Sequence, residues 1–256
     1  MILMFLDLGA VYVLVKREVL KYWRSKSRIA SSLATPLFFF FIMGGGLSKS
    51  VALPGGAGNY LAFVAPGVMA MTVMFASAFG GVSVIVDKQF GFLKEILVAP
   101  VSRTSIVAGK VIGGATTAVL QGLLLMAVIA ITGTPLSITP ISLLFTTLIL
   151  FLVSAIFLSG GLIIATRMDD VHGFQLIMNF FIMPAFLLSG TFFSVDNLPS
   201  WLKPFTLADP LTYGVDGLRA VLVGHSSFPL FTDLAVLSVA CLISVMAAAY
   251  AFNKMQ

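Results

Sequence analysis

The sequence contains little charge, one cysteine and two histidines. Only 10% of its 256 residues are charged, whereas 59% are hydrophobic. A soluble domain carries about 25% charged residues, so this chain has too few charges to cover a folded surface in water. The single cysteine, Cys241, excludes an intrachain disulfide. We interpret it as a small buried hydrophobe rather than a reactive thiol.

Motifs of hydrolytic and nucleotide-binding sites are also missing. The sequence has no H-E-x-x-H and no G-x-S-x-G. The segment SIVAGKV around Gly109 lacks the first glycine and the trailing hydroxyl of a phosphate-binding loop. His172 and His225 have no partners at metal-ligand spacing, and Asp169 and Asp170 are interpreted as a solvated helix start. We therefore expect no catalytic residue, no metal site and no cofactor on this chain.

Long apolar runs dominate the sequence. Runs of this kind, of about 18 or more residues, are typical of helices that cross a hydrocarbon layer about 30 Å thick. The predicted fold class is an all-α polytopic membrane protein, with residues 29–256 forming one domain. Its six transmembrane helices are expected at about 29–47, 60–86, 105–132, 141–166, 174–193 and 231–252.

Residues 1–28 are predicted to form an amphipathic helix at the membrane interface. On a helical wheel, cationic residues lie opposite an apolar face, as in helices that lie in the interface plane. A frayed basic tail is the alternative; the aromatic residues on the apolar face favour the helix. The apolar face comprises Leu8, Tyr12, Val15, Val19, Tyr22 and Trp23, and the opposite face Arg17, Lys21 and Arg24.

The distribution of basic residues predicts the orientation of the chain. Lys and Arg concentrate between the apolar runs, which argues for the positive-inside rule rather than for nucleic-acid binding. With both termini cytoplasmic, twelve of the 15 basic residues are on the cytoplasmic side, among them Lys88, Lys94, Arg103 and Lys110. Lys49, Lys203 and Arg219 remain outside.

A compact charged segment, FGFLKEILVAPVSR, joins the second and third spans on the predicted cytoplasmic side. Phe90, Leu93 and Leu97 are spaced to share one face of a helix, with Lys94 and Glu95 beside them. Pro100 ends this helix, because the residue before a proline disfavours helical geometry. From the residues alone, the segment is either a docking element for a soluble partner or an interfacial helix that only joins two spans.

DKQFGFLKEILVAPVSR resembles the segment between the second and third spans in the ABC-2 family of ABC-transporter permeases. The P-L-x-Y motif followed by arginine before the last span, at Pro210, Leu211, Tyr213 and Arg219, is similar to the family's late signature. The resemblance implies a coupling helix at about 87–103 that docks into a nucleotide-binding subunit. The implied coupling residues are Phe90, Gly91, Leu93, Lys94, Glu95, Leu97 and Pro100.

The family also has short external helices that dip back into the outer leaflet, which implies the same for residues of about 194–228. Asp209 is expected to cap a helix that begins at Pro210, and Asp216 and Arg219, three residues apart, are placed to form an ion pair on that helix. Tyr213 and Arg219 either anchor the helix at the interface or contact the cargo.

The span interiors carry no ionisable residue away from their ends, which argues against a proton relay and favours amphipathic or lipid-like cargo. Candidate residues lining the pathway are Ser77, Ser83, Asn179 and Met183, on the second and fifth spans. The resemblance places these two spans at the transport pathway. The same polar residues are alternatively contacts between packed helices.

The resemblance implies the permease subunit of an ATP-driven exporter in the cytoplasmic (inner) membrane of a prokaryote. ATP and Mg²⁺ would bind to a separate ATPase subunit, and a second permease, most simply a second copy, would complete a homodimer. Further expected contacts are with membrane lipid, and none are expected with nucleic acid. A membrane scaffold or assembly protein without transport activity is the alternative. A passive channel is disfavoured because no filter-like sequence is present.

Overall fold

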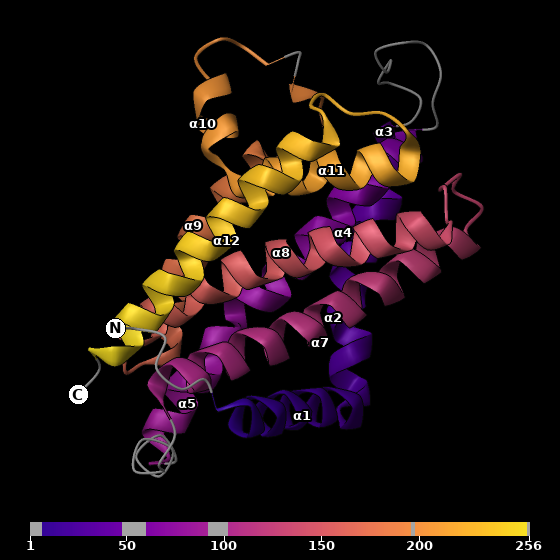
Figure 1. Cartoon of the computed structure of the whole chain (residues 1–256). Helices are drawn as coiled ribbons and strands as arrows, with labels where there is room; N and C mark the ends of the chain where they lie inside the picture. The colour runs from indigo at the N-terminus through magenta and orange to yellow at the C-terminus, as the bar shows by residue number, and fades with distance from the viewer. Residues whose placement is uncertain (1–6, 48–59, 92–101, 196–197, 255–256) are drawn as a thin grey trace.

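The computed structural model describes residues 7–47, 60–91, 102–195 and 198–254, and over these residues every regular element is a helix (Figure 1). Two short elements, the π-helical turn η1 and the 3₁₀ turn η2, interrupt otherwise continuous helical runs. The bounds are α1 Leu8–Arg24, α2 Lys26–Phe39, η1 Phe40–Gly44, α3 Gly45–Leu47, α4 Tyr60–Ala78, η2 Phe79–Gly81, α5 Val82–Gln89, α7 Arg103–Ile131, α8 Pro140–Ala165, α9 Val171–Leu188, α10 Lys203–Ala208, α11 Pro210–Val223 and α12 Leu230–Asn253.

Five helical runs are long and apolar enough to cross a membrane: Tyr60–Gln89, α7, α8, α9 and α12. A sixth candidate is the pair Leu8–Arg24 and Ile29–Gly44, whose two arms meet at 74°. In Figure 1, α1 lies across one end of the bundle, whereas α2 runs along it toward α3. The run α2–η1–α3 covers residues 26–47, about 33 Å of helix, which is long enough for the predicted first span, and we use that name for it. The chain is therefore a multi-pass membrane protein, as predicted.

The fifth span is shorter than predicted and is shifted toward the N-terminus. It covers Val171–Leu188 rather than 174–193. The carboxylate of Asp170 accepts a hydrogen bond from the backbone N–H of Gly173 at 2.6 Å, so Asp170 caps the helix as expected. The backbone hydrogen bonds from Gly173 and His172 hold the pKa of this carboxyl below its usual value. Beyond the helix, Gly190 has a φ of +73°, a left-handed conformation that glycine adopts easily.

The apolar face of α1 divides between two environments. Tyr22 is buried, and Val15 and Val19 are half-buried on the side that packs against α7. Tyr12 and Trp23 are 64% and 69% exposed, so they remain available to the membrane. The predicted amphipathic helix is present. Part of its apolar stripe packs against α7, and the rest is exposed.

The second span and α8 cross in close backbone contact. A methyl group added at Gly161 would lie 2.3 Å from the Ala78 carbonyl oxygen, and one at Gly81 would lie 2.6 Å from the Gly161 carbonyl oxygen. The two backbones therefore touch where only glycine fits. Near this point, the hydroxyls of Ser77 and Ser154 are hydrogen-bonded at 2.6 Å. Glycine and hydroxyl residues are typical of close helix packing in membranes.

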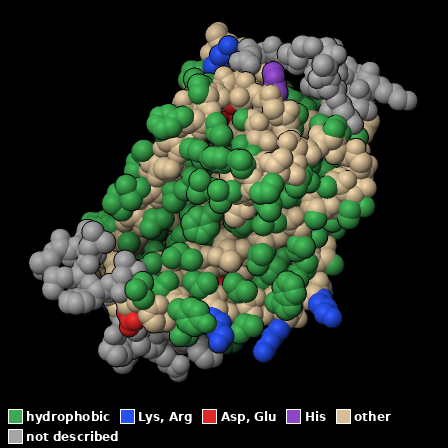
Figure 2. Space-filling view, turned by 45° about the vertical axis from the view of Figure 1, so that its right-hand side comes forward, with side chains coloured by type: hydrophobic (Ala, Val, Ile, Leu, Met, Phe, Trp, Pro, Cys, Tyr) green, Lys and Arg blue, Asp and Glu red, His purple; other side chains and the backbone are tan. Residues whose placement is uncertain are grey.

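The two ends of the bundle differ in charge. We call the end formed by α1, α5, the start of α7 and the end of α12 the basic end. The backbone N–H of Asp7 donates to Ser105 Oγ at 2.9 Å, and Arg103 Nη1 donates to the Asn253 carbonyl at 2.9 Å, so α1, α7 and α12 meet there. Figure 2 shows hydrophobic side chains over the middle of one face, with most of its Lys and Arg at the lower margin. At the opposite end lie α3, α10 and α11 (Figure 1).

Candidate functional site

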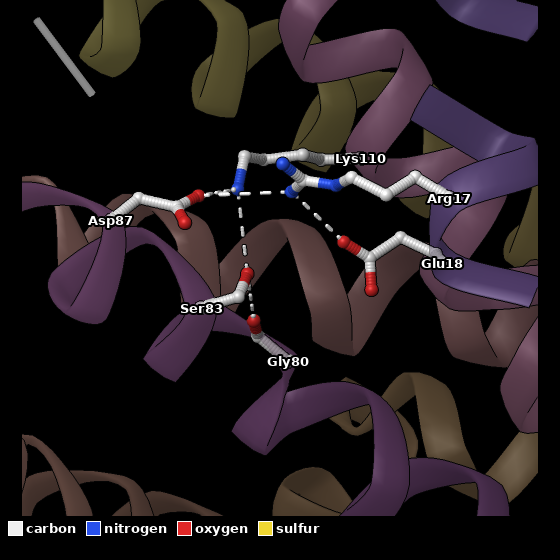
Figure 3. A network of polar contacts seen from close by, with 6 residues as sticks. All are labelled: Arg17, Glu18, Gly80, Ser83, Asp87 and Lys110. Atoms are coloured by element: carbon white, nitrogen blue, oxygen red, sulfur yellow. Dashed lines mark hydrogen bonds and ion pairs between the residues drawn. The ribbon is translucent and has the colours of Figure 1, made fainter. Parts of the chain in front are cut away.

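A cluster of charged and polar side chains joins three elements at the basic end (Figure 3). Lys110 Nζ, from α7, lies 2.8 Å from Asp87 Oδ2 and 3.4 Å from Ser83 Oγ, both on α5. Ser83 in turn donates to the carbonyl of Gly80 at 2.9 Å. From α1, Arg17 Nη2 lies 3.8 Å from Asp87 Oδ2. We call Arg17, Glu18, Ser83, Asp87 and Lys110 the Asp87 cluster.

The central ion pair of this cluster is withdrawn from solvent. The side chain of Lys110 is 4% exposed and that of Asp87 is 16% exposed. A buried ammonium group is strongly unfavourable unless a carboxylate and hydrogen bonds compensate it, and Asp87 and Ser83 provide both. The pair therefore fixes the end of α5 against the start of α7. Arg17, which is also paired with Glu18 at 3.2 Å, adds α1 to this contact.

Two ionisable residues of the spans, each near the end of its helix, are buried rather than solvated, and the first is Lys110. The sequence counts it among the basic residues of the connection, but it lies inside α7 and is buried. Asp233, near the start of α12, is likewise fully buried. The sequence does contain a signal for the ion pair between Asp87 and Lys110. Asp87 and Lys110 have opposite charges and flank the predicted coupling segment on its two sides.

The end of α5 also contacts the link that leads into α9. Lys88 Nζ forms an ion pair with the Asp169 carboxylate. The side-chain amide of Gln89 donates to the Asp169 carbonyl at 2.8 Å. Asp169 immediately precedes the capping residue of α9. The end of α5 is therefore in direct contact with both α7 and the residue before the start of α9.

The coupling residues predicted from the sequence are only partly described. Phe90 is 73% exposed, and Gly91 has a φ of +78°, a conformation that ends the helical path of α5. In the sequence, Phe90 and Gly91 come directly after Lys88 and Gln89, which contact Asp169. Five others lie outside the described residues: Leu93, Lys94, Glu95, Leu97 and Pro100.

A cavity of about 470 Å³, which we call the larger cavity, lies between the first, second, third and fifth spans. Its size is in the range of small-molecule sites, about 300–1,000 Å³. No charged side chain lines it. The lining residues are Tyr22, Ser31, Ser32, Thr35, Pro36, Phe39, Met71, Thr72, Phe75, Ala76, Phe79, Thr117, Ala118, Gln121, Met183 and Phe186.

The wall of the larger cavity combines aromatic rings with hydroxyl groups. The ring centroid of Phe75 lies 6.5 Å from that of Phe79 and 6.3 Å from that of Phe186. The amide of Gln121 donates to the Ser32 carbonyl at 3.3 Å. Such a wall offers apolar contact and a few hydrogen bonds but no counter-charge, which suits an uncharged apolar ligand.

A smaller cavity, about 190 Å³, lies next to the Asp87 cluster. Ala76, Phe79 and Thr117 line both cavities. In contrast to the larger cavity, this one is lined by four charged side chains, Glu18, Lys21, Asp87 and Lys110. Its other lining residues are Ser77, Gly80, Val82, Ser83, Val86, Gly114, Leu158 and Leu162.

The four residues predicted to line the pathway fall in three different places. Met183 lines the larger cavity, and Ser77 and Ser83 line the smaller one. Both serines also bond within the protein, Ser77 to Ser154 and Ser83 to Lys110. Asn179 lies on the exposed side of α9 and lines neither cavity.

At the opposite end, Arg219 connects three elements. It is 2% exposed and lies on α11. Its Nη2 donates to the Gly190 carbonyl at 2.9 Å, and its guanidinium lies 3.8 Å from the centre of the Phe63 ring on α4. A desolvated cation–π contact of this kind is worth about 2 kcal/mol. Arg219 therefore holds the ends of the second and fifth spans together at this end of the bundle.

The predicted ion pair between Asp216 and Arg219 does not form. Asp216 instead accepts hydrogen bonds from the backbone N–H groups of Ser227 and Phe228, at 2.9 Å each. The carboxylate is used to fix the loop between α11 and α12, while Arg219 points to the spans. A spacing of three residues permits an ion pair on one helix. In this structure, Asp216 instead bonds to the loop before α12, and Arg219 contacts α4 and the Gly190 carbonyl.

The start of α11 follows the prediction. Asp209 accepts a hydrogen bond from the Leu211 backbone N–H at 3.0 Å, and Pro210 is the first helical residue. Burial raises the pKa of the Asp209 carboxyl to about 7, although the Leu211 hydrogen bond acts in the opposite direction. Tyr213 donates from its hydroxyl to the Leu207 carbonyl at 3.0 Å, which ties α11 to α10.

Over the described residues, no group of three His, Cys, Asp or Glu side chains is placed to hold a metal ion. The arrangement instead provides a cavity without charged lining residues and a second cavity with charged ones. At the basic end, ion pairs join α5 to α7 and to Asp169. These features define a polytopic helical membrane protein with interior binding space.

The comparison with known sequences identifies the family. A family profile described as "ABC-2 type transporter" matches residues 9–223. The chain belongs to this family. It is 30% identical to Nodulation protein J of Rhizobium leguminosarum bv. trifolii, over 79% of this chain and 78% of that protein. It is also 30% identical to the inner membrane transport permease YadH of Escherichia coli (strain K12), over 80% of this chain and 79% of that protein.

Proposed function

We propose that the chain is the permease subunit of an ABC exporter, which moves an amphipathic cargo outward with energy from a separate ATPase. The family membership supports a transport role. The relative named as an inner membrane transport permease supports the cytoplasmic membrane of a prokaryote as the location. The basic end then faces the cytoplasm with both chain termini, in accord with the positive-inside rule.

The observation that carries the proposal is the double contact of α5. Its end is joined to α7 through Asp87 and Lys110, and to the start of α9 through Lys88, Gln89 and Asp169. The predicted coupling segment follows directly after these contacts. Movement of that segment by an ATPase would therefore be passed to the second, third and fifth spans, three of the spans that line the larger cavity.

The larger cavity is the proposed cargo site. Its aromatic rings and hydroxyls favour the apolar part of an amphipathic molecule, such as a drug-like compound or a lipid. An ionised group would leave water without a counter-charge there. Among the residues predicted to line the pathway, Met183 belongs to this site. The exposed Asn179 on α9 suits a second permease of the homodimer, because an exposed amide within a span needs a polar partner or water.

ATP and Mg²⁺ are assigned to the partner ATPase, which Phe90, Gly91, Leu93, Lys94, Glu95, Leu97 and Pro100 would contact. Pull-down of the detergent-solubilised chain from its native membranes, followed by an assay of ATP hydrolysis in the eluate, tests this assignment. The wild type is expected to bring down an ATPase. A variant with Leu93→Asp and Glu95→Lys is expected to lose at least about 90% of it, because an apolar contact is replaced and a charge is reversed.

Two controls make the result decisive. The exchange Phe231→Asp places a charge on the exposed side of α12, away from the coupling segment, and should leave the ATPase yield unchanged. Size-exclusion chromatography checks that all variants remain folded. If the folded wild type carries no ATPase activity, the exporter assignment fails and a membrane scaffold without its own transport becomes the better account.

A further inference from the structure

Three residues lie at the boundary between the larger and the smaller cavity. Ala76, Phe79 and Thr117 line both cavities, and of these three only Phe79 has the volume to separate them. Its ring is stacked beside that of Phe75, with centroids 6.5 Å apart and planes at 24°. Phe75 itself lines only the larger cavity and not the smaller one.

Phe79 lies at an interruption of the second span. It is the first residue of η2, the 3₁₀ turn between α4 and α5. A 3₁₀ stretch inside a helix often marks a functional hinge. Here the turn ends at Gly81, whose backbone touches that of Gly161 on α8. This contact provides a fixed point about which α5 and α4 can change their relative angle.

The two sides of this turn carry different functions. On one side, α5 holds Ser83 and Asp87 of the Asp87 cluster and continues toward the coupling segment. On the other, α4 supplies Met71, Thr72 and Phe75 to the wall of the larger cavity. Phe79 is therefore positioned where a rotation of α5 would change the separation of the cavities.

The smaller cavity is chemically distinct from the larger one. Its two ammonium groups, Lys21 and Lys110, are matched in number by the carboxylates of Glu18 and Asp87. Formal charge on its wall is balanced, so it suits a polar head group without net charge. Of its lining residues, Lys21 and Val86 are exposed, on α1 and α5 at the basic end.

We propose that the smaller cavity is the cytoplasmic vestibule of the transport path, and that Phe79 is the gate between the vestibule and the larger cavity. The inference rests on the proposed export function and specifies the cargo further. The cargo has an apolar body for the larger cavity and an uncharged or zwitterionic head that first occupies the vestibule. Movement of the coupling segment turns α5 at η2 and moves the Phe79 ring out of the boundary.

Cysteine accessibility tests the gate without any partner protein. Cys241→Ala first removes the native thiol. Val82→Cys then reports on the vestibule and Thr72→Cys on the larger cavity, since each residue lines only one of them. Both are labelled with a charged, membrane-impermeant methanethiosulfonate in vesicles whose cytoplasmic face points outward. We expect Val82→Cys to react at least about tenfold faster than Thr72→Cys, because a closed gate excludes the solvent-borne reagent.

Removal of the Phe79 ring is the critical step. Phe79→Ala is expected to raise the labelling rate of Thr72→Cys at least about tenfold, because it opens the boundary. Phe75→Ala removes an equal ring one turn away and should change the rate by less than about threefold. Phe79→Leu, which keeps much of the volume, replaces the alanine variant if that variant does not fold. Equal effects at Phe75 and Phe79, or an unreactive Val82→Cys, would overturn the proposal.

A second measurement tests the head-group class. Lysophosphatidylcholine, which is zwitterionic, should slow the labelling of Val82→Cys more than the anionic lysophosphatidylglycerol does. The reverse order would reject a vestibule for heads without net charge. Neither assay needs ATP or an ATPase. A failure of ATPase association would thus remove the proposed export function and leave the accessibility result intact.

Discussion

Gly161→Ala is expected to lower the thermal unfolding midpoint of the detergent-solubilised protein by about 5 °C or more. The added methyl group would lie 2.3 Å from the Ala78 carbonyl oxygen, and backbone atoms cannot rotate away as a side chain can. The second span and α8 must then separate at their closest contact. Overpacking costs about 1–3 kcal/mol, and a clash between two backbones lies at the upper end of this range, at about 3 kcal/mol. That cost exceeds the helix-propensity gain of about 1 kcal/mol for replacing glycine by alanine.

Gly160 provides a matched control in the same helix. A methyl group added there has no atom within 4 Å, so Gly160→Ala should leave the midpoint unchanged or raise it slightly. Both variants gain the same helix propensity, and only the contact with the second span differs. Equal midpoints for the two variants would show that the backbone contact at Gly161 does not hold the bundle together.

Lys110→Met is the second substitution with a large expected effect. It removes the ammonium group and leaves the Asp87 carboxylate, 16% exposed, with Arg17 3.8 Å away as its remaining cation. Breaking one partner of a buried ion pair typically costs about 3–5 kcal/mol. The unfolding midpoint in detergent should therefore fall more than for Gly161→Ala. In the double variant with Asp87→Leu, most of the loss should be recovered, because no unpaired charge stays behind.

Lys21→Met is the control for this experiment. Lys21 lines the smaller cavity, as Lys110 does, but its side chain is exposed. Surface substitutions usually change the free energy of unfolding by less than about 0.5 kcal/mol. Similar effects at Lys21 and Lys110 would contradict a stabilising role for the buried pair. A double variant as unstable as Lys110→Met would show that lost packing, not the unpaired carboxylate, is responsible.

The spans and their caps could be predicted from the sequence because they depend on local information. Apolar runs of membrane length predict α7, α8 and α12 to within about two residues at each end. Asp170 and Asp209 precede helices whose first N–H groups their carboxylates satisfy, which requires only neighbouring residues. The predicted fifth span lies too far along the chain, because the turn at Gly190 ends the helix before Phe192 and Phe193, which extend the apolar segment in the sequence.

The charge contacts could not be predicted in the same way, since they depend on how separate helices pack. Asp216 and Arg219 have the spacing of a helical pair, yet each is turned toward a different element by the packing of α11. From the sequence, Lys110 is counted with the connection between the second and third spans. Its burial follows only from the packing of α5 beside α7. The cavities are a further step away, because their walls combine side chains from several spans.

ATP-dependent uptake by vesicles tests the central claim most directly. Vesicles whose cytoplasmic face points outward, containing the chain and its co-purified ATPase, are supplied with a fluorescent zwitterionic amphiphile. We expect uptake that requires ATP and Mg²⁺, that the Leu93→Asp and Glu95→Lys variant abolishes, and that Phe231→Asp preserves. Uptake that proceeds equally without ATP, or in the coupling variant, would contradict transmission of energy through the segment that follows α5.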